Sequence, residues 1–185
     1  MAATSHSNLT MITGGAWSGK SAWATGQWSA YNDVIHIGTG LRTDPRLDSH
    51  IQTLIDARPK SWTHIEEPFH VGETLYQYKD RGIPILIDSA SQMITNIAVQ
   101  SSSKYAPDQL FDHLTASAEV LLDTIASAAR VNKILLVTAE TGWSPAPESP
   151  MQWAVRRAIG VMNQHLATMA GSVFVLCCGI EKKLK

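Results

Sequence analysis

A glycine-rich stretch near the start of the sequence carries the residues best suited to bind phosphate. It runs from Gly14 to Ser21 and reads G-x-x-x-x-G-K-S, which is the spacing of a phosphate-binding P-loop. Its glycines let successive backbone N–H groups point at phosphate oxygens, Lys20 can place a charge on the terminal phosphates, and the Ser21 hydroxyl can bind Mg²⁺. We therefore predict a nucleotide-binding loop made of Gly14, Gly15, Ala16, Trp17, Ser18, Gly19, Lys20 and Ser21.

The residues on either side of this stretch favour a P-loop over a glycine turn that binds nothing. Residues 9–13 are strand-like and residues 21–24 are compatible with a helix, which is the order that a P-loop requires. Such a loop also needs an acid that holds the metal ion or its water, placed at the end of a neighbouring apolar strand. Asp88 follows the apolar run 83–87 and is our candidate. The alternative is that its carboxylate caps the helix that follows.

Short apolar runs alternate with longer amphipathic ones along the chain. We expect strands at 34–37, 62–66, 83–88, 133–138 and 173–178, and helices at 44–57, 71–81, 91–99, 108–129 and 150–169, before a short basic tail. Continuous apolar strands separated by helices predict an α/β fold with a mainly parallel sheet covered on both faces. Together with the P-loop, this predicts a P-loop NTPase-type three-layer sandwich. Ligands of such sheets bind outside the carboxyl ends of the strands.

Glu140 falls at that same edge of the expected sheet. It begins a proline-rich loop just after the strand expected at 133–138. Position alone leaves two interpretations open: an acid that belongs to the binding site, or a solvated loop acid.

Composition limits the remaining possibilities. The chain has 185 residues, of which 44% are hydrophobic and 17% charged, and its formal net charge is −1. We expect one globular domain at 9–185 after a flexible leader at 1–8, with no nucleic-acid partner. No apolar run approaches the roughly 20 residues that span a membrane. Cys177 and Cys178 fall in an expected buried strand, where neighbours point to opposite faces, so we expect reduced, buried thiols in a cytoplasmic protein.

The motifs together resemble one known family. Three early segments carry the likeness: residues 13–21, the stretch from Arg58-Pro59-x-x-Trp62 to Glu66-Glu67-Pro68, and Asp88 with Thr95-Asn96. A later block from Glu140-x-Gly142-Trp143 to Asn163-Gln164 is more specific. These segments resemble the bifunctional adenosylcobinamide kinases / adenosylcobinamide-phosphate guanylyltransferases of cobalamin biosynthesis, and the likeness covers the chain after the leader.

The resemblance implies a P-loop fold, commonly assembled as a homotrimer, that carries out two reactions. One phosphorylates the aminopropanol hydroxyl of adenosylcobinamide, a cobinamide-type corrinoid, from a nucleoside triphosphate (GTP or ATP) with Mg²⁺. The other moves GMP from GTP onto that phosphate through a guanylylated histidine. By position, Ser21 and Asp88 would bind the metal, and Arg58 and Glu140 would lie in substrate-binding or loop positions. The nucleotide would contact the P-loop, Thr39, Gly40, Leu41, Glu66 and Asp88.

The sequence departs from the family pattern where the nucleophilic histidine is expected. That histidine falls at Leu54, or at Thr53 if the register slips by one, and neither side chain can form a phosphoramidate. His50 is a candidate substitute, but it lies one helical turn, about 5.4 Å, from Leu54. A nucleophile must come within about 3–3.5 Å of the phosphorus. The alternative for His50 is a surface or structural role.

Phosphoryl transfer does not need that histidine, because it depends on positioning and on charge stabilisation. With Lys20 and Asp88 as catalytic residues, we predict phosphorylation of adenosylcobinamide ahead of GMP transfer. One alternative is a nucleotide-binding interaction protein without catalysis, favoured by Trp17 and Arg46, which replace family residues. Another is a small kinase with a different acceptor. Five further histidines show no metal-ligand spacing, and we assign no role to His36, His64, His70, His113 and His165.

Overall fold

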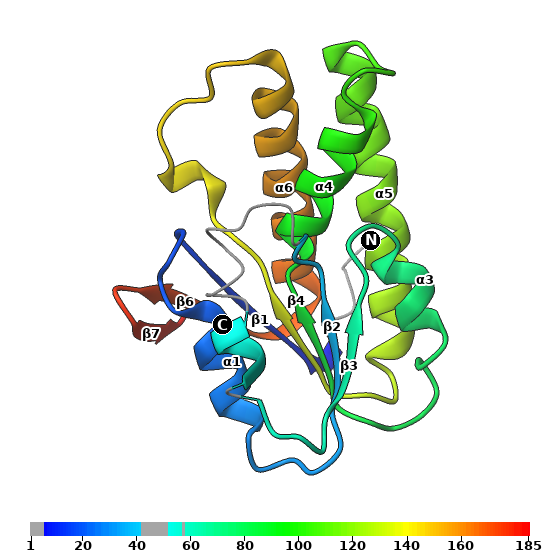
Figure 1. Ribbon diagram of the computed structural model, residues 1–185, viewed down its shortest axis with the longest axis vertical. Coiled ribbons are helices and arrows are strands. Elements are labelled where there is room, and N and C mark those ends of the chain that lie inside the picture. The colour runs from blue at the N-terminus through cyan, green and yellow to red at the C-terminus, as the bar shows by residue number, and fades with distance from the viewer. Residues whose placement is uncertain (1–5, 42–51, 57) are drawn as a thin grey trace.

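A single sheet forms the middle of the molecule. The computed structural model describes residues 6–41, 52–56 and 58–185. Within these ranges seven strands lie in the order β3-β2-β4-β5-β1-β6-β7 (Figure 1). Only the β6–β7 pair is antiparallel. The strands are β1 (His6–Gly14), β2 (Ile35–Gly38), β3 (Thr63–Glu66), β4 (Ile85–Asp88), β5 (Ile134–Val137), β6 (Ala170–Cys177) and β7 (Ile180–Lys183).

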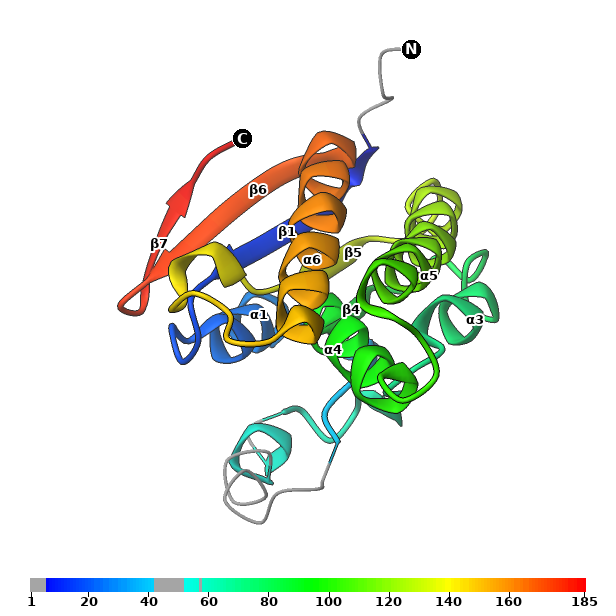
Figure 2. The same ribbon diagram turned by 90° about the horizontal axis from the view of Figure 1, so that it is seen from above.

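Helices cover the two faces of the sheet unequally. The larger core contains side chains of α3 (Val71–Tyr76), α4 (Ala90–Ser101), α5 (Pro107–Ala128) and α6 (Pro150–Met169) against one face. Figure 2 shows α4, α5 and α6 close together. The smaller core lies on the other face and includes α1 (Lys20–Trp28). The expected three-layer α/β arrangement with a mainly parallel sheet is therefore confirmed.

Side-chain alternation in the short strands decides which residues face each core. In β2, Ile35 and Ile37 belong to the larger core, so His36 between them points to the face of α1. In β4, Ile85 and Ile87 belong to the larger core and Leu86 to the smaller one. The polar residues at even positions of β2 and β4 therefore share the less densely covered face.

Most predicted elements are present, and α6 has the predicted bounds 150–169. Three ends differ. β1 begins at His6, which pairs with Ala170 of β6, so residues 6–8 of the expected leader belong to a strand. α3 ends at Tyr76 rather than at residue 81, and the turn after it reaches Gly82, whose φ is 68°. The expected basic tail forms β7, because its backbone pairs with the end of β6.

The expectation that both cysteines are buried is wrong. Cys177 ends β6 and Cys178 lies in the turn before β7, with a φ of 53°. Both thiols are free and exposed, and their Sγ atoms are 3.9 Å apart. The alternation rule failed here because it holds for a continuing strand, whereas the chain turns at Cys178.

Two other expectations concern helices. Residues 52–56 are helical, within the helix expected at 44–57, while residues 42–51 and 57 lie outside the described part of the chain. No helix of the described residues has the length and apolar character needed to cross a bilayer.

Gly14 marks the tightest backbone approach in the fold. A Cβ at this position would lie 2.2 Å from the carbonyl oxygen of Leu176 in β6, and the φ of Gly14 is 147°. The P-loop therefore leaves the sheet along a path that only glycine permits.

We expect Gly14→Ala to lower the free energy of unfolding by about 1–3 kcal/mol, because the strand must shift away from β6. Gly26→Ala is the matched control: Gly26 lies in α1, and a Cβ added there would meet no atom within 4 Å, so alanine should raise stability by up to about 1 kcal/mol. Urea titration measures both. Equal midpoints for Gly14→Ala and the wild type would contradict the prediction.

Candidate functional site

The predicted phosphate-binding loop connects β1 to α1, as the motif requires. Gly19, with a φ of 95°, is the N-cap of α1 and makes no side-chain cap. The loop is supported from the C-terminal hairpin, because the Gly179 N–H donates to the Ser18 carbonyl at 3.2 Å. A cavity of about 310 Å³ follows residues 16–22. This is a backbone cradle that opens at the N-terminus of a helix, which suits an anion.

Lys20 is half-buried beside this cradle. Its Nζ donates to the Gly15 carbonyl at 2.5 Å and lies 3.4 Å from Ser18 Oγ. Burial lowers the pKa of Lys20, and the negative charge of Asp88 opposes that shift. The ammonium is thus held against the loop and within electrostatic reach of the proposed metal acid.

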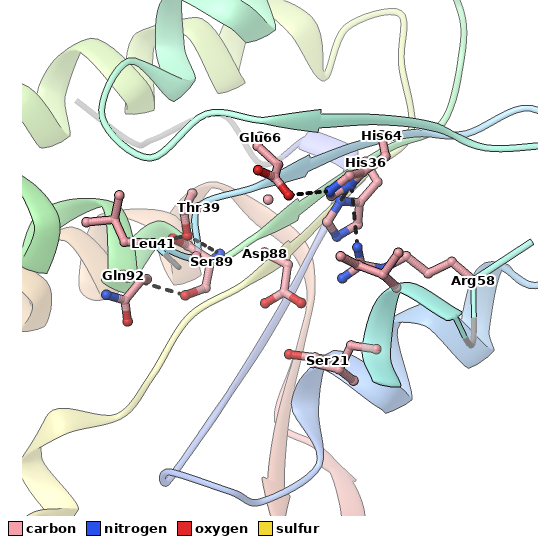
Figure 3. A pocket seen from close by; sticks show the side chains of 14 residues that line it. Ser21, His36, Thr39, Leu41, Arg58, His64, Glu66, Asp88, Ser89 and Gln92 are labelled. Carbon is pink, nitrogen blue, oxygen red and sulfur yellow. Dashed lines mark hydrogen bonds and ion pairs between the residues drawn. The ribbon is translucent and has the colours of Figure 1, made fainter. Parts of the chain in front are cut away.

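A second cavity of about 250 Å³ opens at the C-terminal ends of β2, β3 and β4 (Figure 3). It gathers site residues that are far apart in the sequence. Those that the sequence predicted are Ser21, Thr39, Gly40, Leu41, Arg58, Glu66 and Asp88. The parallel register explains the meeting, since Gly38 of β2 lies opposite Glu66 on one side and Asp88 on the other.

Asp88 does not cap the helix that follows it. Ser89 is the N-cap of α4, and its side chain accepts from the Gln92 N–H at 3.3 Å. Ser89 also exchanges two hydrogen bonds with Thr39: its N–H donates to Thr39 Oγ1 at 2.8 Å, and Thr39 Oγ1 donates to its carbonyl at 2.9 Å. The alternative of a capping role for Asp88 is therefore removed, and its carboxylate faces the cavity (Figure 3).

The residues present fit a magnesium ion bound together with a nucleotide. Ser21 and Asp88 bring a hydroxyl and a carboxylate to one cavity. Among the described residues, no group of three histidine, cysteine, aspartate or glutamate side chains could hold a metal ion by itself. Mg²⁺ needs no such group, because it keeps several waters and is bound by one or two protein ligands plus substrate phosphates.

Two histidines that the sequence left without a role lie side by side in this cavity. His36 Nδ1 and His64 Nδ1 are 2.8 Å apart, and their rings cover Gly38, where a Cβ would come within 3.1 Å and 3.2 Å of them. Arg58 NH1 lies 3.4 Å from His64 Nδ1, and Glu66 Oε1 lies 3.6 Å from His64 Nε2. The signal was hidden in the strand register, which pairs His36 with His64 and which no sequence spacing reveals.

The neutral form of His36 dominates in the folded protein. His36 is 1% exposed. Its pKa falls from 6.5 to about 2 because burial penalises the imidazolium and because Arg58 and His64 add like charge. His36 therefore acts as a neutral hydrogen-bonding group at the back of the cavity.

Glu140 lies next to the P-loop through its backbone. Its N–H donates to the Gly14 carbonyl at 3.0 Å. Its side chain accepts from the Gly142 N–H at 3.0 Å and so caps the short helix η1 (Thr141–Trp143). Glu140 lines neither of the two cavities. In this arrangement its carboxylate orders the loop, a role that neither interpretation from the sequence included.

Leu54 lines both cavities, the one along the P-loop and the one at the strand ends. Leu54, which stands where the family has its nucleophilic histidine, therefore lies at the predicted nucleotide site. His50 and Arg46 lie outside the described residues, so the substitution of the nucleophile by His50 stays a prediction.

The loop between β1 and α1 and the order of the sheet define a P-loop NTPase-type fold. A family model described as "Cobinamide kinase / cobinamide phosphate guanyltransferase" matches residues 10–184. The chain belongs to this family.

Curated relatives match over nearly their full length. The chain is 28% identical to the "Bifunctional adenosylcobalamin biosynthesis protein CobU" of Escherichia coli strain K12, over 96% of this chain and 99% of the relative. It is 30% identical to the protein of the same name from Salmonella typhimurium, with the same coverage. The CobP protein of Pseudomonas aeruginosa is 26% identical, over 95% of this chain and 96% of the relative.

A comparison with solved structures supports the fold. An ATPase from the type III secretion system of pathogenic bacteria aligns with a TM-score of 0.60 at 14% identity. The alignment covers 91% of this chain and 51% of the ATPase chain. This likeness extends to the P-loop fold alone, and it confirms the predicted fold class.

The buried His36 predicts a pH dependence of stability. Because its folded pKa of about 2 lies below the ordinary 6.5, the unfolded chain binds a proton between these values and the folded chain does not. Stability is therefore complete above pH 6.5 and falls as the pH is lowered. From pH 7 to pH 5 we expect a loss of about 2 kcal/mol from this group.

Denaturant titrations at several pH values measure that loss. His36→Phe should flatten the slope by this amount, whereas the control His165→Phe, at an exposed position, should keep it. A His36→Phe slope equal to that of the wild type would contradict the assignment.

Proposed function

We propose that this protein transfers the γ-phosphoryl group of GTP or ATP, bound with Mg²⁺, to the aminopropanol hydroxyl of adenosylcobinamide. One observation carries the proposal: Ser21 and Asp88 line one cavity, beside the half-buried Lys20. Family membership and the relatives' names, which refer to adenosylcobalamin biosynthesis, supply the acceptor. We also propose that a single domain carries the site and that the protein works in the cytoplasm. The resemblance to the family further suggests a homotrimer.

The chain's own residues can account for this reaction. The N–H groups of the loop Gly14–Ser21 bind the phosphates, and Lys20 adds a positive charge. Ser21 and Asp88 would hold Mg²⁺, which would supply charge neutralisation on the phosphate oxygens. The acceptor hydroxyl oxygen forms a bond to the γ-phosphorus while the bond to the β–γ bridging oxygen breaks. A nucleoside diphosphate leaves, and the hydroxyl proton passes to water.

Guanylyl transfer requires a nucleophile that the described site lacks at the family position. Leu54 lines both cavities, and its side chain has no lone pair with which to attack the α-phosphorus. Thr53, the alternative position, is also not a histidine. We therefore propose that phosphorylation is retained and that transfer of GMP through this helix is lost.

Trp17 weighs less against catalysis than the sequence suggested. It adopts a left-handed conformation with a φ of 58°, and its side chain is 76% exposed. Trp17 lines the P-loop cavity, but most of its indole is exposed, so it does not fill the cradle of backbone N–H groups. This observation favours an active enzyme over a nucleotide-binding protein without catalysis.

Phosphorylation is tested with Mg·GTP or Mg·ATP and adenosylcobinamide, following the phosphorylated corrinoid by mass spectrometry. Lys20→Met and Asp88→Asn should each lower kcat by about 100-fold or more, because each removes charge stabilisation at the transferred group. Lys60→Met, at an exposed position, is the control. Wild-type turnover that survives in Lys20→Met would contradict the assigned role of the loop.

The loss of GMP transfer is tested by incubation with α-labelled GTP. We expect no acid-labile label on the wild type. Leu54→His and Thr53→His, made separately, should show which position can form the phosphoramidate, and we expect label on Leu54→His. Stable wild-type labelling that disappears in His50→Ala would refute our interpretation of Leu54 and assign the nucleophile to His50.

A further inference from the structure

One arginine in the strand-end cavity has a buried donor that no described residue accepts from. Arg58 is half-buried, and its NH1 lies 3.4 Å from His64 Nδ1. Its Nε is buried and has no hydrogen-bond partner among the described residues. A guanidinium has five N–H donors, and a buried donor without a partner calls for an explanation. The guanidinium lines the same cavity as Ser21 and Asp88 (Figure 3), so its terminal N–H groups can donate to an anion bound there.

One assignment of protons lets His64 contact both Arg58 and His36 through the same nitrogen. A guanidinium can only donate, so His64 Nδ1 must accept from Arg58. His36 Nδ1, 2.8 Å from the same atom, must then carry a proton and donate it. The His64 proton is left on Nε2, which is 3.6 Å from Glu66 Oε1. In this assignment His64 Nδ1 accepts from both Arg58 and His36, and Nε2 faces Glu66.

This assignment also bears on whether His64 could be the nucleophile. In this assignment Nδ1 accepts hydrogen bonds and Nε2 carries the proton, so neither ring nitrogen offers a lone pair to attack phosphorus. His64 is therefore not a replacement for the family's nucleophile. Its lone pair holds the guanidinium of Arg58, and the buried His36 behind it fixes the ring.

The charges of the cavity show why an oriented arginine matters there. Glu66 and Asp88 contribute two carboxylates, and of the described residues that line this cavity Arg58 alone carries a guanidinium or ammonium group. Burial lowers the pKa of Arg58, while Asp88 and Glu66 oppose that shift. Lys20 is directed at the P-loop carbonyl of Gly15. A triphosphate reaching from the loop into this cavity would meet Arg58 as its second cation.

We propose that Arg58 is a catalytic residue of phosphoryl transfer, whose guanidinium donates to phosphate oxygens and stabilises the charge of the transition state, and that His36 and His64 are positioning residues that aim it. The inference rests on the proposed function and adds residues to its site. An arginine supplied in this way typically contributes a factor of about 10³ or more to phosphoryl transfer. Gly38 is needed for this arrangement, because a Cβ there would displace both imidazoles.

The experiment separates a positioning role from a structural one by replacing His64 in two ways. Asparagine can place an oxygen acceptor where Nδ1 lies, while glutamine extends beyond it toward the position of Nε2. We expect His64→Asn to keep kcat within about threefold of the wild type and His64→Gln to lose about tenfold or more, with the Kd for Mg·nucleotide little changed in both. Equal kcat values for the two variants would overturn the positioning role.

Arg58 is tested directly in the same assay. Arg58→Met should lower kcat by about 100-fold or more, Arg58→Lys should recover only part of it because lysine lacks the planar fork, and Arg130→Met, at an exposed position, should leave kcat unchanged. Circular dichroism and urea midpoints verify folding. A wild type that phosphorylates the corrinoid while Arg58→Met keeps full kcat overturns this inference alone. A wild type that transfers no phosphoryl group overturns the proposed function and the inference with it.

Discussion

The parallel register of β3, β2 and β4 is the constraint on which the site depends. It sets Gly38 between Glu66 and Asp88, and one step back on the same face it sets His36 against His64. A slip of one residue would direct these side chains into the larger core. The register in turn depends on the alternation of Ile35, His36 and Ile37, because the isoleucines must reach the apolar side. The packing of a hydrophobic core thus determines which polar groups meet at the cavity.

The sequence was sufficient for the parts of the fold that follow from local pattern. Proline and glycine punctuation and helical spacing predicted the bounds of α6, and the loop Gly14–Ser21 lies between strand and helix as its motif demands. Asp88 was found because it ends an apolar run. The same kind of pattern could not foresee β7, whose residues are all exposed, because a strand without a buried face has no apolar signature.

Contacts between side chains on neighbouring strands could not be predicted from the sequence. His36 and His64 are 28 positions apart, and their contact of 2.8 Å exists only because β2 and β3 are neighbours in register. Cys177 and Cys178 are exposed because the chain turns at Cys178, and the apolar run before them does not predict that turn. Glu140 was found by its position, but its hydrogen bond to the Gly142 N–H depends on loop geometry.

The hairpin of β6 and β7 has a consequence for how the sheet ends. β7 is an edge strand whose residues Ile180, Glu181, Lys182 and Lys183 are all exposed. An unpaired strand edge invites another chain to add to it, and three consecutive charged residues oppose such addition by repulsion and by the cost of removing them from water. The same hairpin holds the P-loop through the bond from Gly179 to Ser18. The segment that protects the sheet from uncontrolled association is therefore also the one on which the phosphate-binding loop rests.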